Sequence, residues 1–591
     1  MADTDIGSPD PATRFAAEAG DFADGPPADR TTSPAARPAA NPAAAWAAGG
    51  AARRRRRGWL IVAVPAAVSF VLGGYQIGGP SLWRDEAYTK DAIARPFGQI
   101  FVLLGHQDAV HGAYYLLMHV VAAVLGTSAA ALRFPSLCAM VVATGFVAAT
   151  GRRAATLALA PDAGRNGRGL DVPALTGLFS GLLFATAPYM TYYAQMARSY
   201  AIETMFAVIA SYLLLRAWPD GRWRWWLGYA AAVALTGLFN IFGLLIVAAH
   251  GTTLLLTDAR GQAAPGRRIG RIPLRWLAAC GVAVIVLGPL LGLATRQQVQ
   301  IAWLNRPTLN AMERLLTNLA GSRPLIAPFA LLALGGVLTA WRADHWRPLN
   351  PAAIALPWLV VPPFVLVAVS FVKPVYYVRY IEFCLPALAI LAGAGLTGLI
   401  RLAAATPLRR SRLGRSRPGR SLLGRWRLGP LRLAWLPAVL AVAVLAALLA
   451  GPQQAIRQSA ARPDNLRLAS AIVAAHEQPG DVVVYIPATM RVLGTGYPAP
   501  FGRLRDIALN QSAIASGTLT GTEIAGPARL KSRFTASSVQ RVWVVTGAST
   551  YKFPRASTPM GKEKLALLAG AGMHILHRWR AGEVMLTLYG T

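Results

Sequence analysis

Long apolar segments separated by short arginine-rich stretches constrain this 591-residue chain more than any other feature. Hydrophobic residues make up 54% of the chain and charged residues only 14%, which is typical of a multi-pass membrane protein with room for one soluble domain. The formal net charge is +33. Because the arginines lie in runs between apolar segments, they indicate cytoplasmic loops and exclude nucleic acid as a partner.

The apolar segments predict about eleven transmembrane helices, and the basic runs predict their direction. The run Arg53–Arg57 precedes the first segment and places the N-terminus in the cytoplasm. Residues 1–52 lack apolar periodicity and are predicted to be a disordered cytoplasmic tail. With eleven passes every basic run falls inside, including Arg401 to Arg432. The predicted spans are 59–79, 129–150, 173–190, 198–217, two short passes within 225–257, 274–295, 325–342, 353–372, 377–402 and 433–451.

After the membrane region, residues 53–451, the composition changes. Residues 452–591 predict a small α/β domain, and the odd number of passes places it outside the cell. Its expected helices are 464–476 and 562–571, and its expected strands are 481–486, 541–545, 573–579 and 584–589. All three cysteines lie in apolar segments, so this domain has no disulfide. It also contains no nucleotide-binding glycine motif, metal-ligand spacing or nucleophile elbow.

Two adjacent carboxylates, Asp85 and Glu86, follow the first span directly. Carboxylates at a membrane boundary are costly and often mark a functional site, although a solvated charge cluster past a helix end is the alternative. The loop after them contains two apolar stretches, 97–104 and 111–119, that are too short to span comfortably. They are predicted to be helices lying in the membrane interface. The second could instead be a short span, but Arg152 and Arg153 would then fall outside, so the interfacial prediction is favoured.

The polar residues of the predicted outer loops form a candidate site. Carboxylates, aromatic rings and amides suit a sugar, while arginine and lysine at the bilayer edge suit a lipid-linked phosphate. For single tyrosines, an interfacial aromatic belt is the simpler interpretation. A divalent metal at His106, Asp108 and His111 is less favoured, because their spacing is not a recognised ligand motif. The candidates are Arg84, Asp85, Glu86, His106, Asp108, His111, Tyr114, Tyr115, Gln195, Arg198, Tyr200, Lys373, Arg379 and Tyr380.

Five short motifs, all on the predicted outer face, carry a family resemblance. They are Leu82–Tyr88, Asp108–His119, Ala131–Ser136, Tyr193–Tyr200 and Tyr377–Tyr380. In this order the pattern resembles the polyprenyl-phosphate-sugar-dependent glycosyltransferases of the GT-C fold. It is most similar to the branch with protein O-mannosyltransferases, the aminoarabinose transferase of lipid A and actinobacterial mannosyltransferase-like proteins. The chain departs from that pattern at Met196 and Gly112-Ala113, where related sequences often have a glutamate and two prolines.

The resemblance implies a polytopic GT-C membrane fold and an inverting transfer of a sugar, with mannose expected, from a polyprenyl phosphate to an extracytoplasmic acceptor. No cofactor besides the lipid-linked donor is implied. Asp85 is the expected base and Glu86 a supporting carboxylate, although their order stays open. Arg379, Lys373, Arg198 and Tyr380 are expected to bind the donor phosphate. The expected substrate contacts are Arg84, His106, Asp108, His111, Tyr114, Tyr115, Gln195 and Tyr200.

Two alternatives belong to other functional classes. A lipid or sugar transporter would have charged residues at mid-membrane, broken helices and internal repeats, whereas here the ionisable residues gather in outer loops. A non-catalytic cell-envelope scaffold would have no need of the Asp85-Glu86 pair. The favoured location is the plasma (inner) membrane, with the polyprenyl-phosphate sugar, the acceptor and membrane lipids as partners.

Overall fold

The computed structural model describes residues 42–159, 171–258, 271–342, 349–405, 436–536, 539–547 and 558–591. By internal contacts the chain divides into two units, residues 1–55 and 56–591, and the site lies in the second. Residues 1–41 of the tail predicted to be disordered lie outside the described residues, as does most of the arginine-rich stretch from Arg401 to Arg432. From Pro42 the chain belongs to a helix, in an alanine-rich stretch with high helix propensity.

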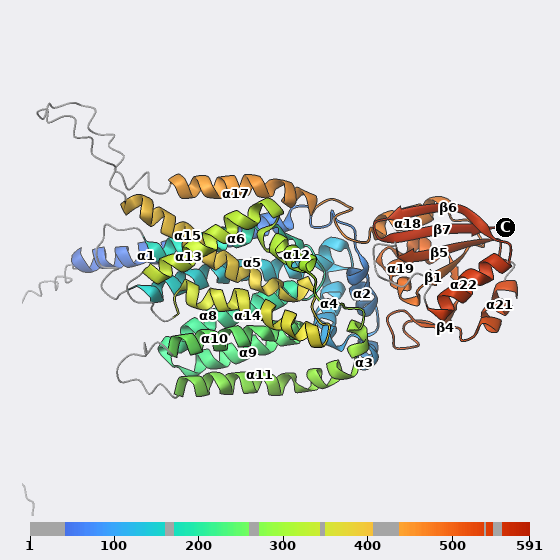
Figure 1. The fold of residues 1–591 in the computed structure, drawn as a ribbon, viewed down its shortest axis with the longest axis horizontal. Coiled ribbons are helices and arrows are strands. Elements are labelled where there is room, and N and C mark those ends of the chain that lie inside the picture. The colour runs from blue at the N-terminus through green and yellow to red at the C-terminus, as the bar shows by residue number, and fades with distance from the viewer. Residues whose placement is uncertain are drawn as a thin grey trace, which may run out of the picture. The chain divides into compact units, whose positions relative to one another are not determined.

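The larger part of the second unit is a bundle of apolar helices (Figure 1). Among the described residues, six helices are long and apolar enough to cross a membrane, or seven if the pair α6–α7, bent by 64°, is one span. The chain is therefore a multi-pass membrane protein, and the number eleven stays a prediction. The bundle contains the part of α1 (Pro42–Gly74) that follows residue 55, together with α5 (Ala129–Ala158), α6 (Val172–Thr186), α7 (Pro188–Ala194), α8 (Tyr200–Asp220), α9 (Trp223–Phe239), α10 (Leu245–Asp258), α11 (Arg271–Arg296), α13 (Ile326–Arg342), α14 (Pro351–Val372), α15 (Leu385–Ala405) and α17 (Leu436–Ala455).

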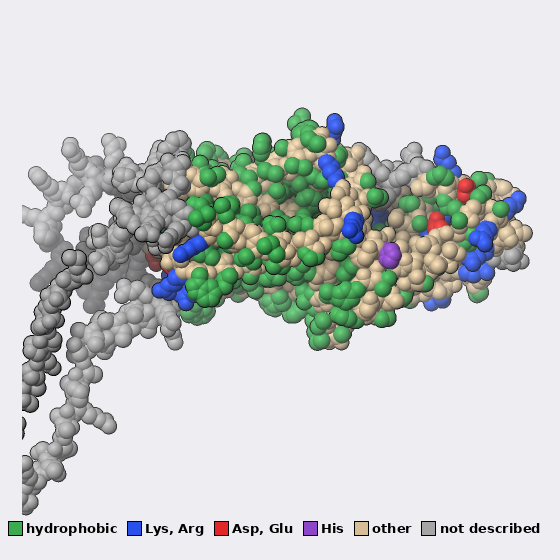
Figure 2. Space-filling view, turned by 90° about the horizontal axis from the view of Figure 1, so that it is seen from below, with side chains coloured by type: hydrophobic (Ala, Val, Ile, Leu, Met, Phe, Trp, Pro, Cys, Tyr) green, Lys and Arg blue, Asp and Glu red, His purple; other side chains and the backbone are tan. Residues whose placement is uncertain are grey.

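Small residues let the central helices approach closely. A Cβ added at Gly177 of α6 would lie 2.6 Å from the carbonyl oxygen of Ala148 in α5, so that contact needs glycine. In membranes, where lipid tails are as apolar as leucine, such close packing holds helices together. The outward surface of the bundle is hydrophobic (Figure 2). This surface is what a protein embedded in lipid requires.

Short helices connect α1 to α5 at one end of the bundle. The predicted helices at 97–104 and 111–119 are confirmed as α3 (Phe97–His106) and α4 (Gly112–Leu125). Before them lies α2 (Arg84–Ile93), and the single turn η1 (Ala109–His111) joins α3 to α4. The turn η5 (Val378–Cys384), which follows α14, lies at the same end (Figure 1). This end of the bundle brings the predicted site residues together.

Residues after α17 form a sheet region beside α2 to α4 (Figure 1). Its sheet has the strand order β2-β1-β5-β7-β6, with β1 parallel to β2 and β5, and β7 antiparallel to β5 and β6. The four predicted strands are confirmed, whereas β2, β3 and β4 have only two or three residues and show no alternation. The strands are β1 (Val482–Ile486), β2 (Arg505–Asp506), β3 (Leu509–Gln511), β4 (Thr522–Glu523), β5 (Arg541–Gly547), β6 (His574–Ala581) and β7 (Val584–Gly590).

Helices of the sheet region pack on both the sheet and α2. The predicted helices are confirmed as α18 (Leu466–His476) and α22 (Pro559–Gly570). A short helix, α19 (Val492–Gly496), lies against α2. Ala87 of α2 is wholly buried in the apolar core that α18, α19 and the sheet share. Helix α2 is therefore packed on one side against the sheet region and on the other against the bundle.

Candidate active site

Asp85 lies in the first turn of α2, where the helix dipole favours a carboxylate. Its carboxylate forms an ion pair with the guanidinium of Arg379 in η5. The side chains are 19% and 15% exposed, so a substrate can reach both groups. Arg198, in the turn between α7 and α8, donates from Nη1 to the backbone carbonyl of Asp85 at 3.4 Å. Three segments distant in sequence thus meet at Asp85.

Aromatic rings hold the guanidinium of Arg379 in place. It lies over the ring of Tyr377 at 4.4 Å and over the ring of Trp83 at 5.1 Å, measured to the ring centroids. Nη2 also donates to the hydroxyl of Tyr377 at 3.1 Å. Cation–π contacts of this kind are strongest when they are partly desolvated. The ring contacts therefore hold the guanidinium at the site and use none of its N–H groups, so part of its hydrogen-bonding capacity remains for a ligand.

The pKa of Asp85 reflects competition between burial and charge. Burial by itself raises the pKa of the carboxyl, but the attraction of Arg379, followed by that of Arg198, is stronger in sum. The pKa is consequently below its ordinary value. Asp85 is ionised at neutral pH and can accept a proton.

His111 is a neutral neighbour of these charges. Nη2 of Arg198 lies 2.6 Å from Nε2 of His111, and because a guanidinium can only donate, Nε2 is the acceptor and the ring proton lies on Nδ1. Burial, then Arg198 and Arg379, hold the pKa of His111 well below its ordinary value. This contact occupies one of the two ring nitrogens through which a histidine can bind a metal. Within the described residues, no three His, Cys, Asp or Glu side chains are grouped so as to hold a metal ion.

A second carboxyl group, Asp108, stands near the site in a different environment. The hydroxyl of Tyr115 donates to it at 2.7 Å, and the next backbone N–H, of Ala109, donates to Gln297 at 2.9 Å. Burial raises the pKa of Asp108, and Arg198 offsets this only in part. The two carboxyl groups thus have pKa values shifted in opposite directions, which is a pattern found where one carboxylate serves as a base.

Glu86 does not face this site. Its two carboxylate oxygens accept from Arg133 at 2.8 and 2.7 Å, and one of them also accepts from the N–H of Ala197 at 2.8 Å. Both side chains of the Glu86–Arg133 pair are wholly buried. Successive helical residues point about 100° apart, so Glu86 faces the bundle while Asp85 faces the site. This placement favours a structural role for Glu86 over the expected supporting role in catalysis.

The other predicted residues divide into two groups. Tyr200 and Tyr380 are near the site, since both interact electrostatically with Arg379 and Asp85. The remaining five make their hydrogen bonds or packing contacts with other residues, although Arg84 also interacts electrostatically with Asp85 and Tyr114 with Arg198. Gln195 donates to the carbonyls of Gly73 and Tyr75, Arg84 pairs with Asp464, Tyr114 is buried in the helical core, His106 is exposed beside the carbonyl of Val102, and Lys373 is exposed and bonds to Gln298.

Sequence reasoning gave no role to Arg133, Tyr377 or Asp464. Arg133 lies within the motif Ala131–Ser136, and Tyr377 begins another motif, so the family pattern offered a signal for both. A lone arginine inside an apolar helix is a further signal, because such a charge needs a buried partner. The contact of Asp464 with Arg84 could not be predicted, because nothing in the sequence links the two residues.

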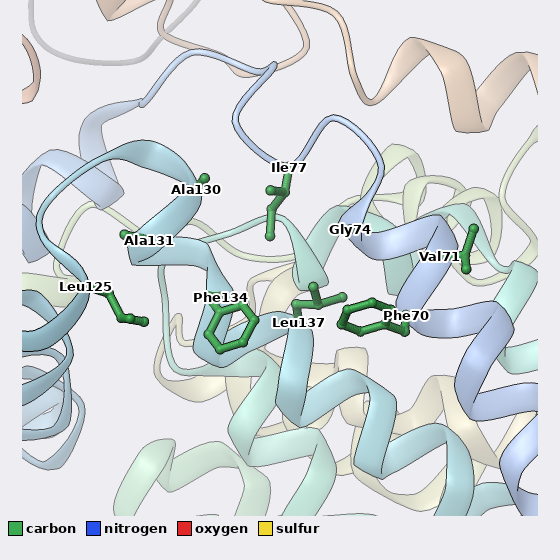
Figure 3. A pocket seen from close by; sticks show the side chains of 9 residues that line it. All are labelled: Phe70, Val71, Gly74, Ile77, Leu125, Ala130, Ala131, Phe134 and Leu137. Carbon is green, nitrogen blue, oxygen red and sulfur yellow. The ribbon is translucent and has the colours of Figure 1, made fainter.

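Two pockets in the described residues contain none of the predicted site residues. One, in the sheet region, has a volume of about 270 Å³ and is lined by Arg505, Asp506, Ile507 and Arg533. The other, of about 550 Å³, is apolar (Figure 3). Its lining residues are Phe70, Val71, Gly74, Ile77, Leu125, Ala130, Ala131, Phe134 and Leu137. It offers no hydrogen bond or charge from a side chain, so it cannot orient a charged head group.

Comparison with known proteins gives a match to a family model and a likeness of the fold. The family model described as dolichyl-phosphate-mannose-protein mannosyltransferase matches residues 172–292. Comparison with curated protein sequences gave no match. The family match over residues 172–292 and the likeness of the fold to a solved GT-C structure agree with the resemblance to membrane glycosyltransferases of the GT-C type. The resemblance inferred from the five motifs is thereby confirmed.

The fold is similar to that of ArnT from Cupriavidus metallidurans. The structure of ArnT in the apo state matches with a TM-score of 0.53 and 17% identity, covering 90% of this chain and 98% of that one. The structure of the same protein bound to undecaprenyl phosphate matches with a TM-score of 0.50, 17% identity and the same coverage. The likeness therefore extends over both the helical bundle and the sheet region.

Proposed function

We propose that this protein transfers a sugar, with mannose the expected one, from a polyprenyl-phosphate donor to a hydroxyl of an extracytoplasmic acceptor, with inversion. The observation that carries the proposal is the contact between the ionised carboxylate of Asp85 and the guanidinium of Arg379, both partly exposed. A base and a phosphate-binding cation are the two groups that this reaction requires. The matched family description and the lipid bound to ArnT support the class of donor.

The reaction needs one displacement. Asp85 takes the proton of the acceptor hydroxyl while the acceptor oxygen forms a bond to the anomeric carbon. The bond between that carbon and the phosphate oxygen breaks, and the polyprenyl phosphate leaves with the bonding electrons. Arg379, with Arg198 beside it, stabilises the negative charge of the departing phosphate. No nucleotide is consumed, which agrees with the lack of a nucleotide-binding motif in the sequence.

The Asp85–Arg379 ion pair must open when the donor binds. In an inverting displacement the base and the leaving group lie on opposite faces of the anomeric carbon, so the two side chains cannot remain in contact. A phosphate competes for the guanidinium of Arg379, and Asp85 then loses its strongest attractive partner. Because an opposite charge favours the ionised form, this loss raises the pKa of Asp85 and makes it a stronger base in the loaded enzyme.

Residues around this pair are proposed to hold the sugar. Asp108, His111, Tyr115 and Tyr200 supply acceptors, a donor and aromatic surface close to the two arginines. Glu86 is assigned to holding α2, because its oxygens are already bonded to Arg133 and Ala197. The positive-inside pattern of the basic runs supports a site on the outer face of the plasma membrane.

The test is whether labelled sugar leaves the lipid. Purified full-length protein is incubated with polyprenyl-phosphate-mannose labelled in the sugar, and in parallel with donors that carry other sugars. Asp85→Asn keeps the size of the side chain but removes the proton acceptor, so transfer should fall about 10²–10⁴-fold. Asp91→Asn is the matched control, since Asp91 lies on the same helix and pairs with Arg95. Its rate should equal that of the wild type.

The anomeric configuration of the product tests the mechanism separately. Inversion supports single displacement by the acceptor, whereas retention would require a covalent intermediate and overturn the role given to Asp85. If label remained on the lipid for every donor in the presence of cell-envelope extract, the proposed function would be wrong. Movement of intact donor across vesicles instead would favour the transporter.

A further inference from the structure

Helix α2, which carries Asp85, begins without a cap of its own. The residue before it, Trp83, has an extended backbone and makes no side-chain hydrogen bond to the first turn. The first backbone N–H groups of a helix have no partner within the helix and need one from elsewhere. Here Asp464 of the sheet region supplies it. Its Oδ2 accepts from the N–H of Arg84 at 3.2 Å, and its Oδ1 accepts from Nη2 of Arg84 at 3.2 Å.

Asp464 is itself held in place by the turn between β6 and β7. Its backbone forms a bridge with Gly582, and the N–H of Glu583 donates to the carbonyl of Pro463 at 2.8 Å. Gly582 has a φ of +65°, and a Cβ there would lie 2.4 Å from the carbonyl oxygen of Pro463. Only glycine permits so close an approach. The side chain of Asp464 is 3% exposed, so its carboxylate has little freedom to move.

The chain that enters α2 is fixed by the same region. The N–H of Ser81 donates to the carbonyl of Ser459 at 3.2 Å, and the N–H of Leu82 donates to the hydroxyl of Tyr497 at 3.1 Å. The hydroxyl of Ser81 accepts from the N–H of Arg467 at 2.9 Å. Residues 81, 82 and 84 are thus all bonded to the sheet region. Asp85 is the next residue in the chain.

We propose that Asp464 is a positioning residue, through which the sheet region holds the first turn of α2 and sets the place of the Asp85 carboxylate. The inference rests on the proposed function and gives the sheet region a part in it, although none of its residues is assigned to the chemistry. Asp464 bonds to the first residue of the helix that carries the base, whereas the donor phosphate is assigned to Arg379, whose backbone belongs to a different segment. Loss of the Asp464 carboxylate should therefore change the rate of the chemical step and leave donor binding intact.

The kinetic experiment compares three full-length variants in lipid nanodiscs. In Asp464→Ala, kcat should fall about 10–100-fold, the effect expected of a small displacement of a catalytic group, while the donor KM stays unchanged. Asp464→Asn should recover part of the rate, because its amide oxygen can still accept from the N–H of Arg84. Lys90→Ala is the matched control. It removes another bond between α2 and the sheet region, from Nζ to the carbonyl of Gly496 at 2.9 Å, away from the first turn.

Hydrogen exchange gives a readout that needs no activity. In Asp464→Ala, the amide hydrogens of Arg84 to Glu86 should exchange faster than in the wild type, while those of strands β5 and β7 stay protected. In Lys90→Ala, exchange at the first turn should not change. Should the alanine variant lose protection in β5 and β7 as well, the sheet region has unfolded and Asp464→Asn takes its place. Exchange at Arg84 to Glu86 should then be faster than in the wild type, because a neutral amide oxygen accepts more weakly than a carboxylate.

The outcomes separate this inference from the proposed function. A wild-type protein that cleaves no lipid donor would remove the proposed function, while faster exchange at the first turn would still establish that Asp464 holds α2. Unchanged exchange in the asparagine and alanine variants would overturn the inference. So would a kcat equal to that of the wild type in a folded Asp464→Ala protein, or an equal loss of kcat in Lys90→Ala.

Discussion

Replacing Arg379 by alanine removes the strongest attractive partner of the Asp85 carboxylate. An adjacent arginine favours the charged form and lowers the pKa of a carboxyl group by about 1–3 units, so its removal raises that pKa. Arg198 and Arg84 remain and continue to lower it. We therefore expect the pKa of Asp85 to rise in this variant, because less attraction is left to offset the effect of burial. Solvent screening is limited, because the side chains are 19% and 15% exposed.

The measurement is the pH dependence of kcat/KM for cleavage of labelled donor, which reports the pKa of the base in the free enzyme. In Arg379→Ala the acid limb should move to higher pH, and the donor KM should rise. In Arg379→Lys the acid limb should lie close to its wild-type position, because the positive charge is restored. Only part of the donor affinity should be recovered, because the bidentate contact with phosphate is lost. Lys373→Ala is the control for charge. Lys373 is exposed, bonds to Gln298, and has no described contact with Asp85.

An unmoved acid limb in Arg379→Ala would refute the reasoning, because it would mean that the ion pair does not control the base. An equal shift in Lys373→Ala would refute it as well, since the effect would then come from general surface charge. In the wild type, the acid limb of kcat should lie at higher pH than that of kcat/KM. That difference is the signature of an ion pair that opens when the donor binds.

Four further predictions concern stability, the Arg198–His111 hydrogen bond, protonation and topology. Glu86→Gln leaves the buried guanidinium of Arg133 without its counter-charge, which should lower the free energy of unfolding by about 3–5 kcal/mol and be visible as a lower Tm. A variant as stable as the wild type would contradict the structural role. His111→Gln should retain more donor cleavage than His111→Ala, because the glutamine oxygen still accepts from an arginine; equal rates would contradict this. Since the pKa of His111 is well below its ordinary value, the wild-type pH profile should have no histidine step near neutrality. A cysteine at Gly480 should react with an impermeant thiol reagent in intact cells and one at Ser421 should not, whereas the reverse result would invert the topology.

Much of the fold could be predicted because hydrophobic patterning is a local property. Apolar segments of sufficient length predicted the bundle, and the short, polar-flanked stretches around Phe101 and Leu116 were confirmed as the separate helices α3 and α4. The strands β1 and β5 could be predicted because both are short runs rich in valine. Strands β2 to β4 could not be predicted, since two or three residues are too few to show the alternation of apolar and polar side chains that marks a strand.

The candidate site could be predicted as a set of residues but not as an arrangement. Asp85 and Glu86 are adjacent, and the sequence left open which one is the base. The structure separates them because neighbouring positions on a helix face different directions, so one carboxylate meets Arg379 and the other meets Arg133. Which direction faces the site depends on the rotation of α2 about its axis. Packing against both the bundle and the sheet region sets that rotation.

By itself, the sequence determined the membrane class, the family motifs and the loops that hold the chemical groups, because length, hydropathy and charge act along the chain. The tertiary structure alone decided which of these groups meet. Asp85 and Arg379 are 294 positions apart, and Arg84 and Asp464 are 380 apart. No local pattern encodes such contacts, because they arise only when helices and sheet bury their apolar faces against one another. That burial brings Asp85 and Arg379 together at the site and places Asp464 at the start of α2.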